Sequence, residues 1–178
     1  MAMTLITTNT SSGASTSDFT SSIDSTYKLY IFKWISITPN VENVFSVNFS
    51  TDAFSNFLTK TTTQFRAYHS EADATSLAYD ANRDIASGTG DQPLAVDIGY
   101  PSNPDSTRTT SGELFLFNPS NTTYVKHFYA ETSLADQGPA IKNVFTGGYV
   151  NSTSAVTAVR FLVNTGTFSG TIKMYGVG

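Results

Sequence analysis

The feature that most constrains this chain is a regular succession of short β-forming runs, each ended by turn-forming residues. The runs are rich in Val, Ile, Thr, Phe and Tyr, and segments such as 118–121 (NPSN) and 164–166 (NTG) separate them. Ser and Thr make up more than a quarter of the 178 residues, whereas Lys and Glu are scarce, so good helix formers are few. This pattern predicts an all-β protein with two antiparallel sheets packed as a sandwich.

The spacing of the runs predicts eight to ten strands. We expect them at residues 27–38, 44–50, 61–70, 94–98, 112–117, 124–132, 141–150, 155–164 and 171–177. A short helix is expected at 53–60, a long surface loop at 71–93, a turn-rich segment at 101–111 and a turn at Gly147-Gly148. Two packed sheets of this size favour a jelly-roll arrangement. An immunoglobulin-like sandwich is the alternative, although it usually has about 100 residues.

The first 26 residues differ in composition from the rest of the chain. Residues 9–26 are almost all small and polar, with Phe19 and Ile23 among the few side chains that could be buried. We therefore divide the chain into a Ser/Thr-rich N-terminal arm, 1–26, and a β-sandwich domain, 27–178. Such a composition alone is typical of a flexible segment. We expect the arm to be held in place, either by its own domain or by a neighbouring molecule.

The predicted strand at 27–38 carries large side chains on both faces. Tyr30, Phe32 and Trp34 lie on one face at period two, and Leu29, Ile31, Ile35 and Ile37 lie on the other. A strand with one face in water should alternate between apolar and polar residues, and this one does not. The three aromatic side chains therefore need cover, and we name Tyr30, Phe32 and Trp34 as a candidate interface, covered by the arm, by the loop 71–93 or by another subunit.

The sequence contains no motif that predicts an enzyme or a bound cofactor. His69, Glu71 and Asp73 follow a period of two, but no third nitrogen or sulfur ligand lies nearby, so we interpret them as a solvated polar face and predict no metal site. Asp73, Asp80, Asp84 and Asp91 lack the spacing of a calcium loop, which leaves calcium binding by this acidic segment open. Neither a nucleophile elbow nor a paired-carboxylate arrangement is present, so no catalytic residue is predicted.

Charge and hydropathy exclude further classes of partner. The net charge is −4, and no run of Lys or Arg reaches three residues, so we expect no nucleic-acid partner. The longest mostly apolar stretch is interrupted by Lys28 and Lys33 and is too short to cross a bilayer, so we expect no membrane association. Exposed aromatic residues could stack on sugars, and five tyrosines are possible platforms: Tyr68, Tyr79, Tyr100, Tyr124 and Tyr129.

Several segments carry a family resemblance. They are IDSTYKLYIFKWISITP (23–39), QFRAYHSEAD (64–73), SGELFLFNPSNTTYVKHFYAETS (111–133), GGYVNSTSAVTAVRF (147–161) and GTIKMYGVG (170–178). In these segments, which cover most of the chain from Ile23 onward, the sequence resembles a family of small virion structural proteins of marine bacteriophages, such as those of cyanobacteria and of abundant ocean bacteria.

The resemblance implies a protein of the phage particle that is present in many copies. We expect a location on the surface of the virion and a capsid decoration or cement role. The expected partners are other copies of this chain, with a trimer favoured, and the major capsid protein or other virion proteins. The alternative is a tail-fibre or host-surface carbohydrate-binding domain. The resemblance carries no catalytic residue that could be transferred to this chain.

Overall fold

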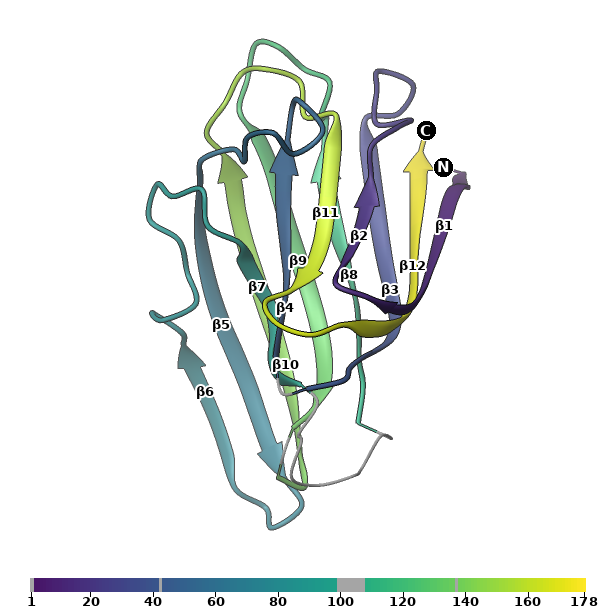
Figure 1. Cartoon of the computed structure of the whole chain (residues 1–178). Helices are drawn as coiled ribbons and strands as arrows, with labels where there is room; N and C mark the ends of the chain where they lie inside the picture. Colours follow the sequence, from purple (N-terminus) through teal and green to yellow (C-terminus); the bar gives the residue numbers. More distant parts are fainter. Residues whose placement is uncertain (1, 42, 99–107, 137) are drawn as a thin grey trace.

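The computed structural model describes residues 2–41, 43–98, 108–136 and 138–178. Within these ranges the chain forms twelve strands and no helix, and the strands make two antiparallel sheets that pack face to face (Figure 1). The predicted all-β sandwich is confirmed. It follows that none of the described residues forms a helix with the length and apolarity needed to cross a lipid bilayer.

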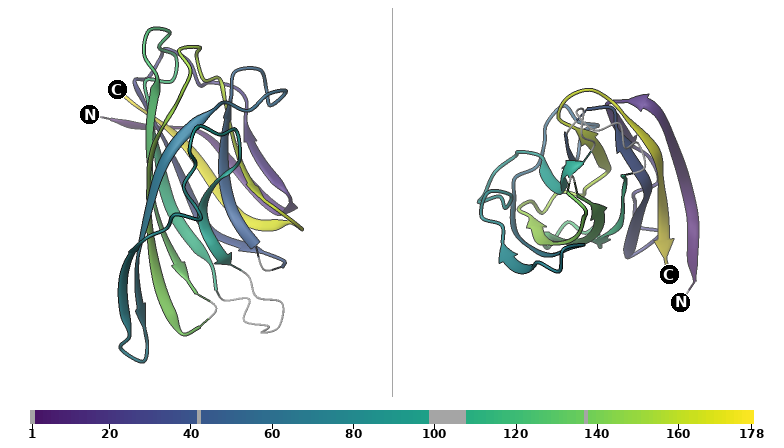
Figure 2. Two further views of the ribbon diagram at one scale, coloured as in Figure 1. Left: turned by 90° about the vertical axis from the view of Figure 1, so that its left-hand side faces the viewer. Right: turned by 90° about the horizontal axis from the view of Figure 1, so that it is seen from below.

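The two sheets differ in width. The larger sheet has the order β1-β12-β3-β8-β9-β10-β5-β6, and the smaller has the order β2-β11-β4-β7. The larger sheet consists of β1 (Met3–Ala14), β12 (Phe168–Val177), β3 (Leu29–Pro39), β8 (Thr110–Phe117), β9 (Lys126–Ala135), β10 (Ala140–Val150), β5 (Lys60–Ser70) and β6 (Thr75–Tyr79). The smaller sheet consists of β2 (Thr16–Phe19), β11 (Ala158–Val163), β4 (Asn43–Ser50) and β7 (Gln92–Ile98). The larger sheet curves around the smaller one (Figure 2).

The strands pair in a nested order along the chain. β1 pairs with β12, β2 with β11, β4 with β7 and β5 with β6, while the β8–β9 hairpin lies between β3 and β10. Each strand of the smaller sheet, β2, β4, β7 and β11, lies in sequence between two strands of the larger sheet. Nested pairs of this kind, rolled into two sheets, define a jelly roll. The jelly-roll arrangement, and not the immunoglobulin-like alternative, is the observed one.

An aromatic core fills the space between the sheets. The side chains with the least exposure come from both layers, and they include Phe32 and Trp34 of β3, Phe45 and Phe49 of β4, and Phe161 of β11. As the alternation of β4 predicts, its inward side chains at positions 45, 47 and 49 are fully buried. Their rings meet mostly at tilted or edge-on angles, for example Trp34 on Phe45 at 5.8 Å between ring centroids.

The N-terminal arm is part of the sandwich. Its residues form the edge strand β1 of the larger sheet, turn near Ser15, and return as the edge strand β2 of the smaller sheet (Figure 1). We expected the arm to be held either by its own domain or by a neighbouring molecule, and the structure shows that its own domain holds it. The polar composition of most of β1 suits this position, since residues 7–12 are small and polar and present little apolar surface at the edge of the sheet.

Four local predictions need correction. The segment expected to be helical at 53–60 is a turn followed by the start of β5, because Ala53 and Phe54 have positive φ angles of 53° and 74°. The expected loop 71–93 contains β6, which pairs with β5. Gly147-Gly148 is not a turn but lies inside β10. Ile37 does not share a face with Ile35: a bulge at Ser36, whose φ is 52°, turns Ile37 into the core.

Candidate interaction surface

Tyr30, Phe32 and Trp34 lie in the core between the sheets. Their side chains are 0%, 0% and 1% exposed within a single chain, so no surface of the three remains for a partner. Part of their cover comes from the arm, as we expected, because Phe19 of β2 packs edge-on against Phe32 with 5.2 Å between ring centroids. The rest comes from the smaller sheet, where Phe161 lies 6.0 Å from Trp34. These three residues are therefore core residues within a single chain.

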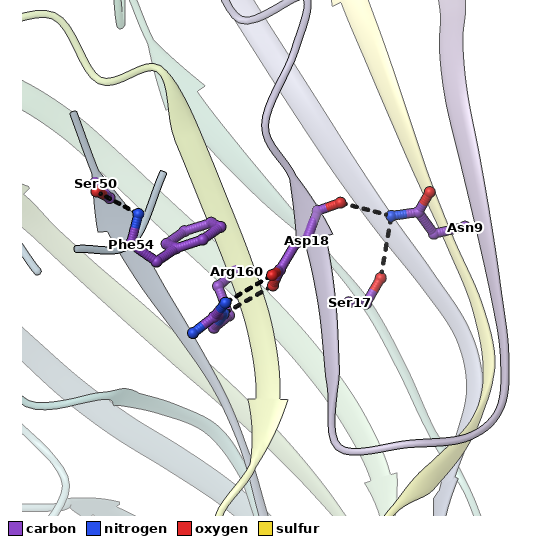
Figure 3. Close-up of polar contacts among 6 residues, drawn as sticks. All are labelled: Asn9, Ser17, Asp18, Ser50, Phe54 and Arg160. Carbon is purple, nitrogen blue, oxygen red and sulfur yellow. Dashed lines mark hydrogen bonds and ion pairs between the residues drawn. The ribbon is translucent and has the colours of Figure 1, made fainter. Parts of the chain in front are cut away.

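Polar contacts fix the arm against the rest of the sandwich (Figure 3). Arg160 of β11 donates two hydrogen bonds to the carboxylate of Asp18 in β2, at 2.8 and 2.7 Å. The guanidinium also lies over the ring of Phe54, 4.2 Å from its centroid. Asn9 of β1 donates to the carbonyl of Asp18 and to the hydroxyl of Ser17, so the two arm strands are tied to each other across the open side of the sandwich.

The outer face of the larger sheet carries most of the exposed apolar side chains. Of the ten large hydrophobic residues described as exposed, nine lie in strands of this sheet, and the tenth, Tyr124, lies in a loop. The nine are Met3, Leu5, Ile35, Phe65, Leu77, Tyr79, Phe117, Tyr129 and Ile141. Each of the nine either alternates along its strand with an inward-facing residue or is paired in the register with an outward-facing residue of the neighbouring strand. All nine therefore lie on the same face of the sheet.

The register joins four of these exposed residues to less exposed apolar neighbours in rows that cross the strands. Among those neighbours, Ile31 is buried, with 7% exposure. One row consists of Leu5, Tyr175, Ile31, Phe115 and Tyr129, each the direct partner of the next on β1, β12, β3, β8 and β9. The adjacent row consists of Met3, Val177, Leu29 and Phe117. We call these nine residues the apolar patch. Within it, the rings of Phe115 and Tyr129 stack with 4.5 Å between their centroids.

A third row on the same face is charged at its centre and aromatic at one end. Lys33 pairs with Glu113 through an ion pair of 2.9 Å, and Glu131 lies directly opposite Glu113 in the register. Burial and the negative charges of Glu113 and Glu131 raise the pKa of Tyr129. Farther along, Phe145 stacks on Phe65 at 5.0 Å. The face therefore presents apolar, charged and aromatic zones side by side.

A shallow depression lies between these zones. It has a volume of about 460 Å³, and polar side chains of four adjacent strands line most of it: Lys33, Ser111, Glu113, Glu131, Ser133 and Asn143. Tyr175 and Ile35 supply apolar walls. A small polar ligand could bind in such a depression with an aromatic ring beside it.

The candidate metal and calcium residues do not converge. His69 and Asp73 contact each other at 3.2 Å in an exposed position, which agrees with the interpretation as a solvated polar face. In the acidic segment, Asp80 pairs with Arg66, Asp84 accepts a hydrogen bond from Tyr79, and Asp91 accepts one from Asn48. Among the described residues, no group of three or more His, Cys, Asp or Glu side chains is placed to hold a metal ion.

The five candidate sugar platforms are spread over the molecule. Tyr79 and Tyr129 lie on the outer face of the larger sheet, Tyr124 projects from the loop before β9, and Tyr68 is half-buried in β5. Tyr100 lies outside the described residues. The apolar patch was not predicted from the sequence. Its signal was the presence of large apolar side chains on both faces of the segments 27–38 and 114–117, where Leu29, Ile31, Phe115 and Phe117 are the outward-facing members.

Comparisons with known proteins give no relative for this fold and surface. No family model matches the chain, and no curated protein sequence or solved structure matches it.

Proposed function

We propose that this chain is a non-enzymatic structural protein of a phage particle, a capsid decoration or cement protein that assembles with other copies of itself. The observation that carries the proposal is the apolar patch on the outer face of the larger sheet. Contiguous apolar surface of this kind on a folded domain marks a site of protein–protein contact. The resemblance to virion structural proteins supplies the particle as the setting.

The dimensions of the face fit an interface between protein subunits. Eight strands spaced about 4.8 Å apart span roughly 34 Å, which is wide enough for the about 800 Å² per partner that a stable interface buries. The apolar patch would form its centre, and the ion pair of Lys33 and Glu113 would lie toward its rim. Aromatic residues such as Tyr129 and Phe117 are the side chains that contribute most to such interfaces.

The self-association is tested by the oligomeric state of the purified protein. Light scattering after size exclusion should show an oligomer, with a trimer favoured, and Phe117→Glu or Tyr129→Glu should shift it to the monomer. Tyr124→Glu is the matched control, since Tyr124 is also an exposed aromatic residue but lies outside the sheet. A monomer at all concentrations, or equal dissociation by the control variant, would contradict assembly through this face.

The particle role needs a separate experiment. A cryo-EM reconstruction of the phage particle should place many copies of the chain on the capsid surface, with the outer face of the larger sheet at an interface. A handful of copies found only at the tail would exclude the decoration role, even if the purified protein forms an oligomer.

A second candidate, a host-surface carbohydrate-binding domain, has one observation in its favour. The depression beside Tyr175 and Ile35 combines hydrogen-bonding side chains with apolar walls, as sugar sites do. Binding to a glycan array that is lost in Asn143→Ala and retained in Tyr124→Glu would favour this function over capsid decoration.

A further inference from the structure

Three polar side chains meet in an enclosed position beside the smaller sheet, apart from the outer face of the larger sheet. Lys60 is the first residue of β5, Asn48 lies near the end of β4, and Asp91 directly precedes β7. The side chains of Lys60 and Asn48 are both 0% exposed. A primary amine and a carboxamide thus face each other away from the molecular surface, and the half-buried carboxylate of Asp91 lies beside the carboxamide.

The hydrogen bonds orient the carboxamide of Asn48 toward the amine. Its Oδ1 accepts from Nζ of Lys60 at 2.8 Å and from the backbone N–H of Phe49 at 2.9 Å. Its Nδ2 donates to Oδ1 of Asp91 at 2.7 Å and to the carbonyl of Thr89 at 3.1 Å. When Lys60 acts as the nucleophile, the N–H of Phe49 is the donor that polarises the carbonyl, and the amide nitrogen is held against a carboxylate.

The enclosure also changes the acidity of Lys60. Burial lowers the pKa of Lys60 to about 8, although the negative charge of Asp91 opposes the shift. Near neutral pH, Lys60 therefore carries the reactive neutral amine in a fraction of the molecules. A neutral buried lysine amine is a nucleophile, and a fixed position next to its target gives it a high effective concentration.

We propose that Lys60 and Asn48 react to form an intramolecular isopeptide bond, with Asp91 as the group that transfers the proton. The amine attacks Cγ of Asn48, the Nζ–Cγ bond forms, and an electron pair moves onto Oδ1, where the N–H of Phe49 stabilises it. One proton of the attacking nitrogen passes through the carboxylate of Asp91 to Nδ2. The carbonyl then re-forms, the Cγ–Nδ2 bond breaks, and ammonia leaves.

The reaction is balanced by the residues that are present. The isopeptide nitrogen keeps one hydrogen, ammonia carries away Nδ2 and the transferred proton, and Asp91 returns to its carboxylate form. No electron is gained or lost, so no oxidant or reductant is needed. The product joins β4 to β5 and thereby links the two sheets covalently, which goes beyond the proposed role of the outer face.

The test is mass spectrometry of the full-length protein after incubation at about pH 9, where the Lys60 amine is mostly neutral. The intact wild-type chain should be lighter than an Asp91→Asn variant by one ammonia molecule, after allowance for the substitution. Trypsin should leave the peptide 34–66 uncut at Lys60, because an amidated lysine is not cleaved, while it still cuts at Lys33 and Arg66. Fragment ions from within residues 49–59 should be absent, since the ring holds them.

Two variants distinguish a covalent bond between Lys60 and Asn48 from a buried hydrogen bond between them. Lys60→Arg keeps a cationic donor but cannot form the bond, and it should show the full mass with a normal digest. Asp91→Asn should also keep the full mass, and cleavage should occur after Lys60. A wild-type chain of full mass with cleavage after Lys60 would overturn the proposal, and it would do so whatever the oligomeric state. An isopeptide bond in Asp91→Asn would overturn the role of Asp91.

Discussion

At the scale of single residues, charged side chains have roles that depend on how far they are enclosed. Arg160 and Asp18 are about one quarter and one third exposed, and they form a two-point contact that holds the arm. The hydrogen bond and the charge of Asp18 raise the pKa of Arg160. Lys33 and Glu113, on the outer face, form a single contact at similar exposure.

A double-mutant cycle should separate these two ion pairs. We expect a coupling free energy of about 1 kcal/mol for Asp18→Ala with Arg160→Ala, because the contact is bidentate and tethers a strand. The matched cycle of Lys33→Ala with Glu113→Ala should give less than about 0.5 kcal/mol. Urea unfolding of the single and double variants measures both. Equal coupling in the two cycles would mean that the arm contact adds nothing beyond a surface pair.

The acidity of Lys60 predicts the pH dependence of the proposed cross-link. Below a pKa of about 8 the amine is protonated and its lone pair is occupied, so the rate of ammonia loss should fall about tenfold for each pH unit. Above that pKa the rate should level off, because nearly all of the amine is already neutral. Time courses of intact mass between acidic and alkaline buffers measure this, and a rate independent of pH would contradict it.

At the scale of elements, close approach between strands explains where glycine is required. Gly148 faces inward on β10, and a Cβ atom there would lie 2.7 Å from the carbonyl oxygen of Thr61 and 3.1 Å from the ring of Phe128. Backbone atoms of a central strand cannot move aside as a flexible side chain can. The sequence pair Gly147-Gly148 therefore serves packing within a strand, which a single sequence cannot distinguish from a turn signal.

Gly148→Ala should destabilise the fold by about 2 kcal/mol through this overpacking. Gly90→Ala is the control, because no atom lies within 4 Å of a Cβ built there, and its free energy of unfolding should stay within about 0.5 kcal/mol of wild type. Thermal and urea unfolding followed by circular dichroism measure both variants. A neutral Gly148→Ala would show that β10 and β5 can separate at little energetic cost.

The arm strand β2 contributes to the core through Phe19. Phe19→Ala should lower the free energy of unfolding by about 3 kcal/mol, because it opens a cavity next to Phe32 and Phe161. Removal of residues 1–19 should in addition shift the emission of Trp34 to longer wavelength. Neither effect should depend on protein concentration, since Trp34 is covered within one chain. A concentration-dependent emission of the intact chain would mean that a second subunit supplies the cover.

The sequence allowed most strands to be predicted, and the misses have physical causes. Strands such as β4 and β5 were predicted within two residues, because β4 has a strong apolar alternation and β5 is rich in strand-forming Thr, Phe and Tyr. β6 was missed because its five residues are nearly all exposed and carry no alternation. The apolar patch was missed because it depends on register: Tyr129 and Ile31 become neighbours in a row only when β3, β8 and β9 align.

At the scale of the whole molecule, the first and last strands lie side by side in the larger sheet (Figure 2). The amide of Ala2 donates to the carbonyl of Gly178 at 3.2 Å, and Met3 is paired with Val177. The two ends of the described chain are therefore within reach of a short connection, as in many compact domains.

A circular permutant should retain this fold. In it, a short Gly-Ser linker would join Gly178 to Ala2, and the chain would be opened between Thr122 and Thr123, which are both exposed. We expect a native circular dichroism spectrum and a loss of less than about 2 kcal/mol of stability. An unfolded or aggregated permutant would show that the order of the strands along the chain matters beyond the final contacts.

The nested pairing also determines the order in which strand pairs can form while the chain is synthesised on the ribosome. Among the described strands, residues 3–14 leave the ribosome first, and their partner, residues 168–177, leaves it last. Pairs of consecutive strands, β5–β6, β8–β9 and β9–β10, can form as soon as their second strand emerges, whereas β1–β12 and β2–β11 need a distant segment. During that interval the nascent β1 has no partner, and the polar run of threonine, asparagine and serine that follows Met3, Leu5 and Ile6 limits the apolar surface that it offers to other chains.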